Sequence, residues 1–118
     1  MKKENQVVNL ELSKRLKELG VKQDSIWWWV LLEGYFDYQL VRPPIGDKEI
    51  KDCCRAFTVA ELGEMLPKMY LSGLSEIGWN CWQFDNMFNI MDYNSYATNT
   101  EANARAKMFV YLLENKLL

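Results

Sequence analysis

The chain has 118 residues, of which 49% are hydrophobic and 25% are charged, as is typical of a globular protein. Its 14 basic and 16 acidic residues give a net charge of −2, and no basic block is present, which argues against duplex nucleic acid as a partner. The chain contains no histidine, so it lacks the commonest general base and the commonest metal ligand. We expect one domain spanning residues 1–118.

The cysteines and the apolar runs predict a cellular setting. Cys53, Cys54 and Cys81 cannot all pair, and a bridge between the adjacent Cys53 and Cys54 would be strained. Their spacing does not match a structural zinc site, so we expect no metal and no cofactor. No apolar run approaches the roughly 20 residues of a membrane span, and the charged start of the chain leads into no signal segment. We expect a cytoplasmic protein without a membrane partner.

The first helix is predicted from Asn9 to Gly20. Asn9 is a favourable N-cap residue, because its side chain can accept a hydrogen bond from a backbone N–H of the first turn. Gly20 can adopt the left-handed conformation that often ends a helix. Between them an apolar stripe repeats at helical spacing: Leu10, Leu12, Leu16 and Leu19.

Two strands follow, over residues 26–32 and 35–41. The pair Glu33-Gly34 between them suits a two-residue hairpin turn. That turn fixes a register in which three cross-strand pairs share one apolar face: Leu31 with Phe36, Trp29 with Tyr38, and Trp27 with Leu40. We expect this face to pack on the core.

The opposite face of this hairpin is also apolar, because Trp28 lies between Trp27 and Trp29 and alternate strand residues point to opposite sides. This second face is predicted to hold Ile26, Trp28, Val30 and Leu32 against Tyr35, Asp37, Gln39 and Val41. A strand that is apolar on both faces needs a cover on each, which a helical layer, a second subunit or a ligand could supply. Because a monomer need not cover both faces, we expect a homo-oligomer.

The middle of the chain contains the strongest local signal. Pro43-Pro44 ends the hairpin, since proline cannot donate to a sheet ladder, and a polar loop over residues 46–52 follows. Thr58 with Glu61 then forms a capping box, which predicts a helix from Thr58 to about residue 66. Residues 70–78 contain serine and two glycines and are predicted to form a loop.

A second hairpin is predicted from residues 79–84 and 87–91, around the turn Asp85-Asn86. A second capping box, Thr98 with Glu101, predicts the last helix. Its apolar residues repeat at helical spacing: Ala102, Ala106, Phe109, Leu112 and Leu113. The predicted order is αββαββα, and we expect an α+β fold with a mainly antiparallel sheet of about four strands flanked by helices.

Three segments of the chain, Leu16-Lys17-Glu18-Leu19-Gly20-Val21-Lys22-Gln23, residues 56–67 (AFTVAELGEMLP) and residues 100–118, resemble a group of small phage and prophage proteins. The element order is similar to that of the phage ABA-sandwich domain. The matching motifs, which cover about half of the chain, are helix caps and core stripes, so the resemblance transfers no catalytic residue. It implies a phage-encoded accessory protein that acts in the bacterial cytoplasm.

Patterns that indicate catalysis are weak. Cys54 beside Arg55 could be an activated thiolate, but no histidine is available as its base. Glu61 and Glu64 are one helical turn apart, but the capping box already accounts for Glu61. The sequence contains no phosphate-binding glycine loop and no serine elbow. We therefore expect no enzyme, with a small hydrolase that uses Cys54 or a carboxylate as the alternative.

The aromatic residues on the second hairpin face give the candidate site. A rigid ring beside amide and carboxylate groups can hold a flat ligand, because the ring stacks and the polar groups bind its edges. The predicted ligand-binding residues are Trp28, Tyr35, Asp37 and Gln39, with Arg42 and Arg55 available for phosphate. The same aromatic face could instead be a second core layer or a protein interface.

Taken with the resemblance, these features predict a non-enzymatic, stoichiometric binder that counteracts a bacterial defence. The first hypothesis is sequestration of a small nucleotide-type signal by the aromatic and polar face. The alternative is an inhibitor that binds a host defence protein directly. The hydrolase is a third, less favoured hypothesis.

Overall fold

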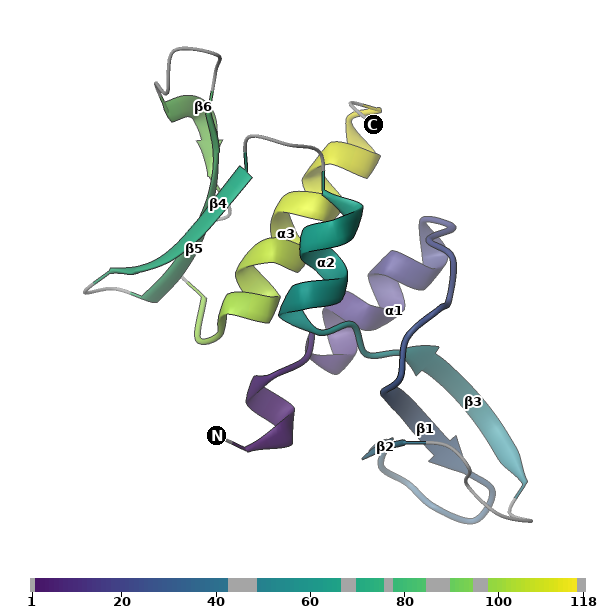
Figure 1. The fold of residues 1–118 in the computed structure, drawn as a ribbon. Helices are drawn as coiled ribbons and strands as arrows, with labels where there is room; N and C mark the ends of the chain where they lie inside the picture. The colour runs from purple at the N-terminus through teal and green to yellow at the C-terminus, as the bar shows by residue number, and fades with distance from the viewer. Residues whose placement is uncertain are drawn as a thin grey trace.

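The computed structural model describes residues 2–42, 49–66, 70–75, 78–84, 90–94 and 98–116. The elements in chain order are a 3-10 helix Lys3–Asn5, α1 Leu10–Glu18, β1 Trp28–Leu32, β2 Gln39–Val41, β3 Ile50–Arg55, α2 Val59–Met65, β4 Tyr70–Ser75, β5 Gly78–Phe84, β6 Ile90–Asn94 and α3 Glu101–Glu114 (Figure 1). Every strand pairing among them is antiparallel. The predicted α+β class is therefore confirmed.

The described strands form two sheets of three, in the orders β2-β1-β3 and β4-β5-β6, rather than one sheet of about four. The helices lie between the sheets (Figure 1). Two strands were not predicted: β3, half of which falls in the predicted polar loop, and β4, which falls in the loop predicted over residues 70–78. The polar and glycine residues of these segments have low strand propensity, but pairing with β1 and β5 satisfies their backbone groups.

The molecule is elongated. Its principal extents are 53 × 30 × 20 Å and its radius of gyration is 15.2 Å, whereas about 13.5 Å is expected for a compact domain of this length. The β1–β3 sheet accounts for much of this elongation, because it projects away from the helices (Figure 1).

Two of the three predicted helix starts are confirmed. The Asn9 side chain accepts a hydrogen bond from the backbone N–H of Leu12, and Thr58 with Glu61 forms the complete capping box of α2. The third predicted start is wrong, because Thr100 rather than Thr98 caps α3. Thr98 instead forms a β-bridge with Trp79, in which two backbone hydrogen bonds measure 2.8 Å each.

The first hairpin differs from its predicted register by two residues. Trp29 lies opposite Leu40, where Tyr38 was expected, and the turn is longer than the Glu33-Gly34 pair. Phe36 was predicted to lie in the core and is instead exposed in this turn. A shift of two residues keeps the paired residues of β1 and β2 on their predicted faces, and it brings Leu40 into a buried cluster.

The triple tryptophan is explained by the central position of β1, which pairs with both β2 and β3. On one face Trp27 and Trp29 pack against a small cluster formed by Val7, Leu40 and Ala56. On the other face Val30 and Leu32 are buried within the single chain. A second subunit is therefore not needed to cover them, and homo-oligomerisation stays a prediction.

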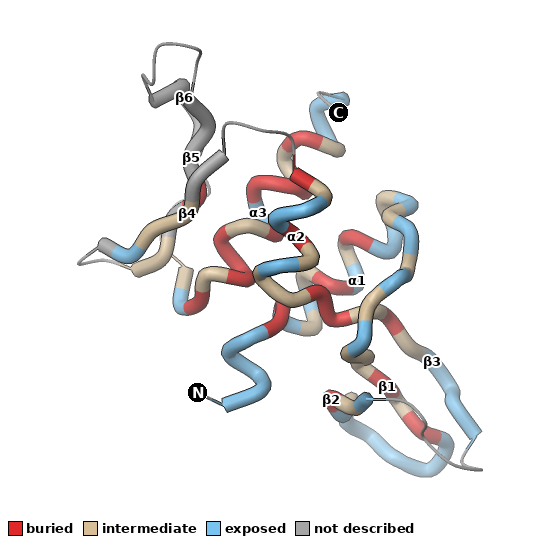
Figure 2. The backbone as a smooth tube through the Cα atoms, viewed as in Figure 1, coloured by how far each residue is buried: buried red, intermediate tan, exposed pale blue. Residues whose placement is uncertain are grey.

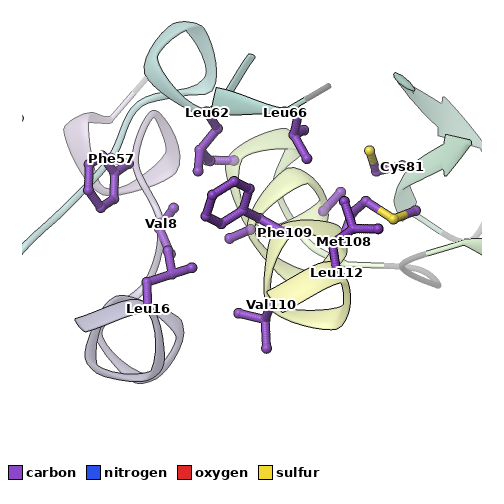
Figure 3. Close-up of a cluster of buried hydrophobic side chains, with 13 residues drawn as sticks. Val8, Leu16, Phe57, Leu62, Leu66, Cys81, Met108, Phe109, Val110 and Leu112 are labelled. Carbon is purple, nitrogen blue, oxygen red and sulfur yellow. The ribbon is translucent and has the colours of Figure 1, made fainter. Parts of the chain in front are cut away.

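The main core forms where the helices meet β5 (Figure 3). α3 is buried along most of its length (Figure 2), and its small residues Ala102, Ala104 and Ala106 allow neighbouring elements to approach closely. The other large contributions come from Val8, Leu16, Phe57, Leu62, Leu66, Cys81, Met108, Phe109, Val110 and Leu112. This cluster is separate from the small one under β1.

Candidate functional site

The structure brings together three of the six predicted ligand-binding residues. Trp28 pairs with Arg55 and Gln39 pairs with Val30, so Trp28, Gln39 and Arg55 share one face of the β1–β3 sheet. Tyr35 and Asp37 lie in the turn between β1 and β2, and Arg42 lies beside Trp27 on the opposite face, 5.9 Å from its ring centre. The two arginines therefore do not converge on one phosphate.

Arg55 already occupies one side of the Trp28 ring. Its guanidinium carbon lies 3.4 Å from the ring centre, a cation–π stack. Two hydrogen bonds to Gln23 hold the residue there: the Arg55 Nε donates to the Gln23 carbonyl at 3.0 Å, and the Arg55 backbone N–H donates to Gln23 Oε1 at 2.9 Å. A ligand could stack on this side of Trp28 only by displacing Arg55.

A set of polar contacts, here called the polar belt, joins α1 to the β1–β3 sheet. The Lys17 ammonium donates to the Cys53 carbonyl at 2.6 Å and lies 3.8 Å from the Asp52 carboxylate. The Lys14 ammonium lies 4.4 Å from the Tyr38 ring centre, and the Tyr38 hydroxyl donates to Asp52. This hydrogen bond raises the pKa of Tyr38 to about 12 and lowers the pKa of Asp52. Asp52 is thus held as an ionised structural acceptor.

The far end of the β1–β3 sheet exposes large apolar side chains. Phe36 is 99% exposed, Tyr35 48% and Ile50 41%. A backbone hydrogen bond of 3.1 Å from Glu33 to Glu49 ties the β1–β2 turn to the start of β3. We call this region the hairpin tip and define it as Glu33, Tyr35, Phe36, Asp37, Glu49 and Ile50. Sequence reasoning missed it because the predicted register placed Phe36 in the core.

A cavity of about 440 Å³ lies where the starts of α2 and α3 meet the 3-10 helix and β5. We call it the helix-end cavity. Its lining includes Asn5, Val59, Trp79, Asn99 and Glu101. No local pattern predicted it, because these residues come from four segments that are distant in the sequence.

The cysteine chemistry considered for a hydrolase finds no support in the geometry. Cys54 is buried, and burial raises the pKa of its thiol to about 11. The thiol therefore stays protonated at neutral pH, although the nucleophile would be the thiolate. Within the described ranges, no group of three or more Cys, Asp and Glu side chains could hold a metal ion.

No family model matches this chain, and neither the curated proteins nor the solved structures contain a match to it. Of the helices in the described residues, none is long and apolar enough to cross a membrane.

Proposed function

We propose that this protein is a non-enzymatic binder that recognises a partner protein through its hairpin tip. The observation that carries the proposal is the 99% exposure of Phe36 at the end of a projecting sheet. Burying a phenylalanine side chain contributes about 1.5–3 kcal/mol, and aromatic anchors of this kind dominate many interfaces. Tyr35 and Ile50 extend the apolar surface around Phe36.

The charges of the tip indicate the chemistry of the partner. Glu33, Asp37 and Glu49 are all exposed around the aromatic pair. A complementary surface would offer an apolar socket for Phe36 with lysine or arginine side chains on its rim. The same acidic groups would repel the phosphates of a nucleotide bound near Tyr35 and Asp37.

Partner recognition is favoured over the first sequence hypothesis, sequestration of a nucleotide-type signal. The sequestration hypothesis used the Trp28 ring, with Arg42 and Arg55 available for phosphate, whereas Arg55 is stacked on Trp28 and Arg42 lies beside Trp27. The resemblance to phage accessory proteins supplies the proposed setting, in which the chain inhibits a host defence protein in the bacterial cytoplasm.

The test is affinity capture from a bacterial lysate with the parent protein and two matched variants. Phe36→Ser removes the anchor of the tip, and Leu74→Ser removes another exposed side chain, 68% exposed on β4 of the other sheet. We expect one polypeptide to be retained by the parent and by Leu74→Ser and to be lost with Phe36→Ser. Equal capture by all three proteins would contradict the proposal. Native mass spectrometry of the parent showing a retained small molecule in place of a polypeptide would favour sequestration.

A further inference from the structure

We propose that the helix-end cavity binds a small, neutral, planar nitrogen heterocycle of the nucleobase or nucleoside class. Its volume of about 440 Å³ falls within the range of small-molecule sites, which usually combine an apolar wall with a few polar groups. Among the described residues, none that lines the cavity belongs to the hairpin tip.

The walls of the cavity are fixed before any ligand arrives. A β-bridge between Val7 and Thr58 attaches the segment after the 3-10 helix to the start of α2. A second β-bridge, between Trp79 and Thr98, attaches β5 to the segment before α3. The Asn9 backbone N–H donates to Asn103 Oδ1 at 2.8 Å, which links the chain start to α3. A prearranged site loses less conformational entropy on binding.

Behind the cavity, a hydrogen-bond relay connects α2, β4 and α3. Ser72 donates to the Glu101 carboxylate at 3.0 Å, and Arg105 Nε donates to Ser72 at 2.9 Å. Arg105 Nη1 donates to the Val59 carbonyl at 3.1 Å. The relay fixes Glu101 and Val59, which both line the cavity. It also engages two guanidinium nitrogens of Arg105, which is not among the described residues that line the cavity.

The lining chemistry selects the class of ligand. Trp79 packs against the main core and also lines the cavity, so it offers an apolar aromatic wall to a flat ring. Asn5 presents a carboxamide with one acceptor oxygen and two donor hydrogens. The Asn99 Oδ1 already accepts a hydrogen bond from Asn103 Nδ2 at 3.1 Å, so Asn99 offers the ligand chiefly its two donor hydrogens. Paired donors and acceptors of this kind match the edge of a nucleobase. The Asn5 carboxamide makes no hydrogen bond to another described residue, so its donors and acceptor are available to the ligand.

The charge of the cavity argues against a phosphate on the ligand. Glu101 is the only charged residue among the described residues that line it. The nearby Lys3 ammonium is engaged elsewhere, because it donates to the Leu40 carbonyl at 3.2 Å and lies 5.9 Å from the Trp27 ring centre. A nucleoside is therefore expected to bind more tightly than its 5′-monophosphate.

The proposal can be tested by titrating the ¹⁵N-labelled full chain with adenosine, guanosine, cytidine and uridine, and with their 5′-monophosphates, while following amide and indole resonances. We expect at least one nucleoside to shift resonances of the lining residues, those of Trp79 and Asn99 among them, and its monophosphate to bind more weakly. Asn5→Ala should weaken this binding about fivefold, as expected for one lost hydrogen bond. Glu4→Ala, an exposed change in the same 3-10 helix, should leave it unchanged.

Ala60→Leu provides a second variant that does not depend on a hydrogen bond. Ala60 is exposed at the start of α2 and lines the cavity, so a leucine there fills the site without disturbing the core. We expect it to abolish the shifts, whereas Phe36→Ser should bind the nucleoside as the parent does. The proposal is overturned if no nucleoside shifts the lining residues, if Ala60→Leu binds as the parent does, or if a monophosphate binds more tightly than its nucleoside.

Discussion

The two sheets share a three-stranded antiparallel design but differ in how they are attached to the helices. The β4–β6 sheet packs on α3, and its Cys81 is part of the main core. The β1–β3 sheet packs on the small cluster of Val7, Leu40 and Ala56 and is held to α1 by the polar belt. One sheet thus contributes to the core, and the other presents the hairpin tip to solvent.

Because of this difference, we expect the residues that stabilise the fold to be distinct from those that contact a partner. The side chains of the tip bury little surface, so their replacement should leave the fold intact. Substitutions should therefore become milder along the path from the main core, through the small cluster and the polar belt, to the tip.

Phe57→Ala should have the largest effect, because Phe57 is among the largest fully buried side chains of the main core. We expect a loss of about 3–5 kcal/mol in the free energy of unfolding, from the lost burial and the remaining cavity. Both sheets should lose their protection together in hydrogen exchange during denaturant titration. A loss below about 1 kcal/mol would show that the main core does not hold the two sheets together.

Thr58→Ala should cost about 0.5–2 kcal/mol, because it leaves the Glu61 backbone N–H without its side-chain acceptor. Thr58→Ser is the matched control, since it keeps the hydroxyl. Chemical denaturation should show a clear loss in the free energy of unfolding for Thr58→Ala and a smaller loss for Thr58→Ser. If the Thr58→Ala variant is as stable as the parent, the capping box does not stabilise α2.

Trp29→Phe should destabilise the protein by about 0.5–1.5 kcal/mol. It keeps an aromatic ring but removes the 2.9 Å hydrogen bond from Trp29 Nε1 to the carbonyl of the buried Val8, which would keep only the longer bond of 3.3 Å from Ser13 Oγ. Trp28→Phe is the control, because it retains a ring under Arg55. Equal stabilities of the two variants would contradict the assignment of Trp29 to the inner face.

Tyr38→Phe should have the smallest effect, and the effect should depend on pH. The pKa of Tyr38 is raised from 10.0 to about 12, so on the alkaline side the stabilisation by its hydrogen bond to Asp52 is complete up to pH 10 and is lost as pH rises through 12. The pKa of Asp52 is lowered from 3.8, so the contribution is also lost as pH falls below that value. The stability difference from the parent, measured by urea denaturation at several pH values, should vanish at both extremes. A difference that is constant across this range would exclude the Tyr38–Asp52 bond as its source.

The sequence predicted features that depend on neighbouring residues. Asn9 and Thr58 were identified correctly because a cap involves atoms only three residues away. Thr98 and Thr100 both precede the last helix and both are favourable caps, and the long-range bridge from Thr98 to Trp79 decides between them. The class of fold followed from such local elements.

Features that depend on distant contacts were not predicted. The hairpin register is set by Leu40 packing on Val7 and Ala56, which lie far from it in the sequence. That shift moved Phe36 from the predicted core to the tip. The predicted site kept Trp28, Gln39 and Arg55 on one face because side-chain alternation is a local property, whereas the stack of Arg55 on Trp28 required β3, which had not been predicted.

The central claim, that the hairpin tip contacts a partner protein, is tested most directly by photo-crosslinking in the bacterial cell. A benzophenone amino acid replaces Phe36 in one variant and Leu74 in a second. Leu74 is also exposed but lies on the other sheet. We predict one discrete covalent adduct of the chain with another polypeptide from position 36 and none from position 74. The absence of an adduct from position 36, or the same adducts from both positions, would contradict the account.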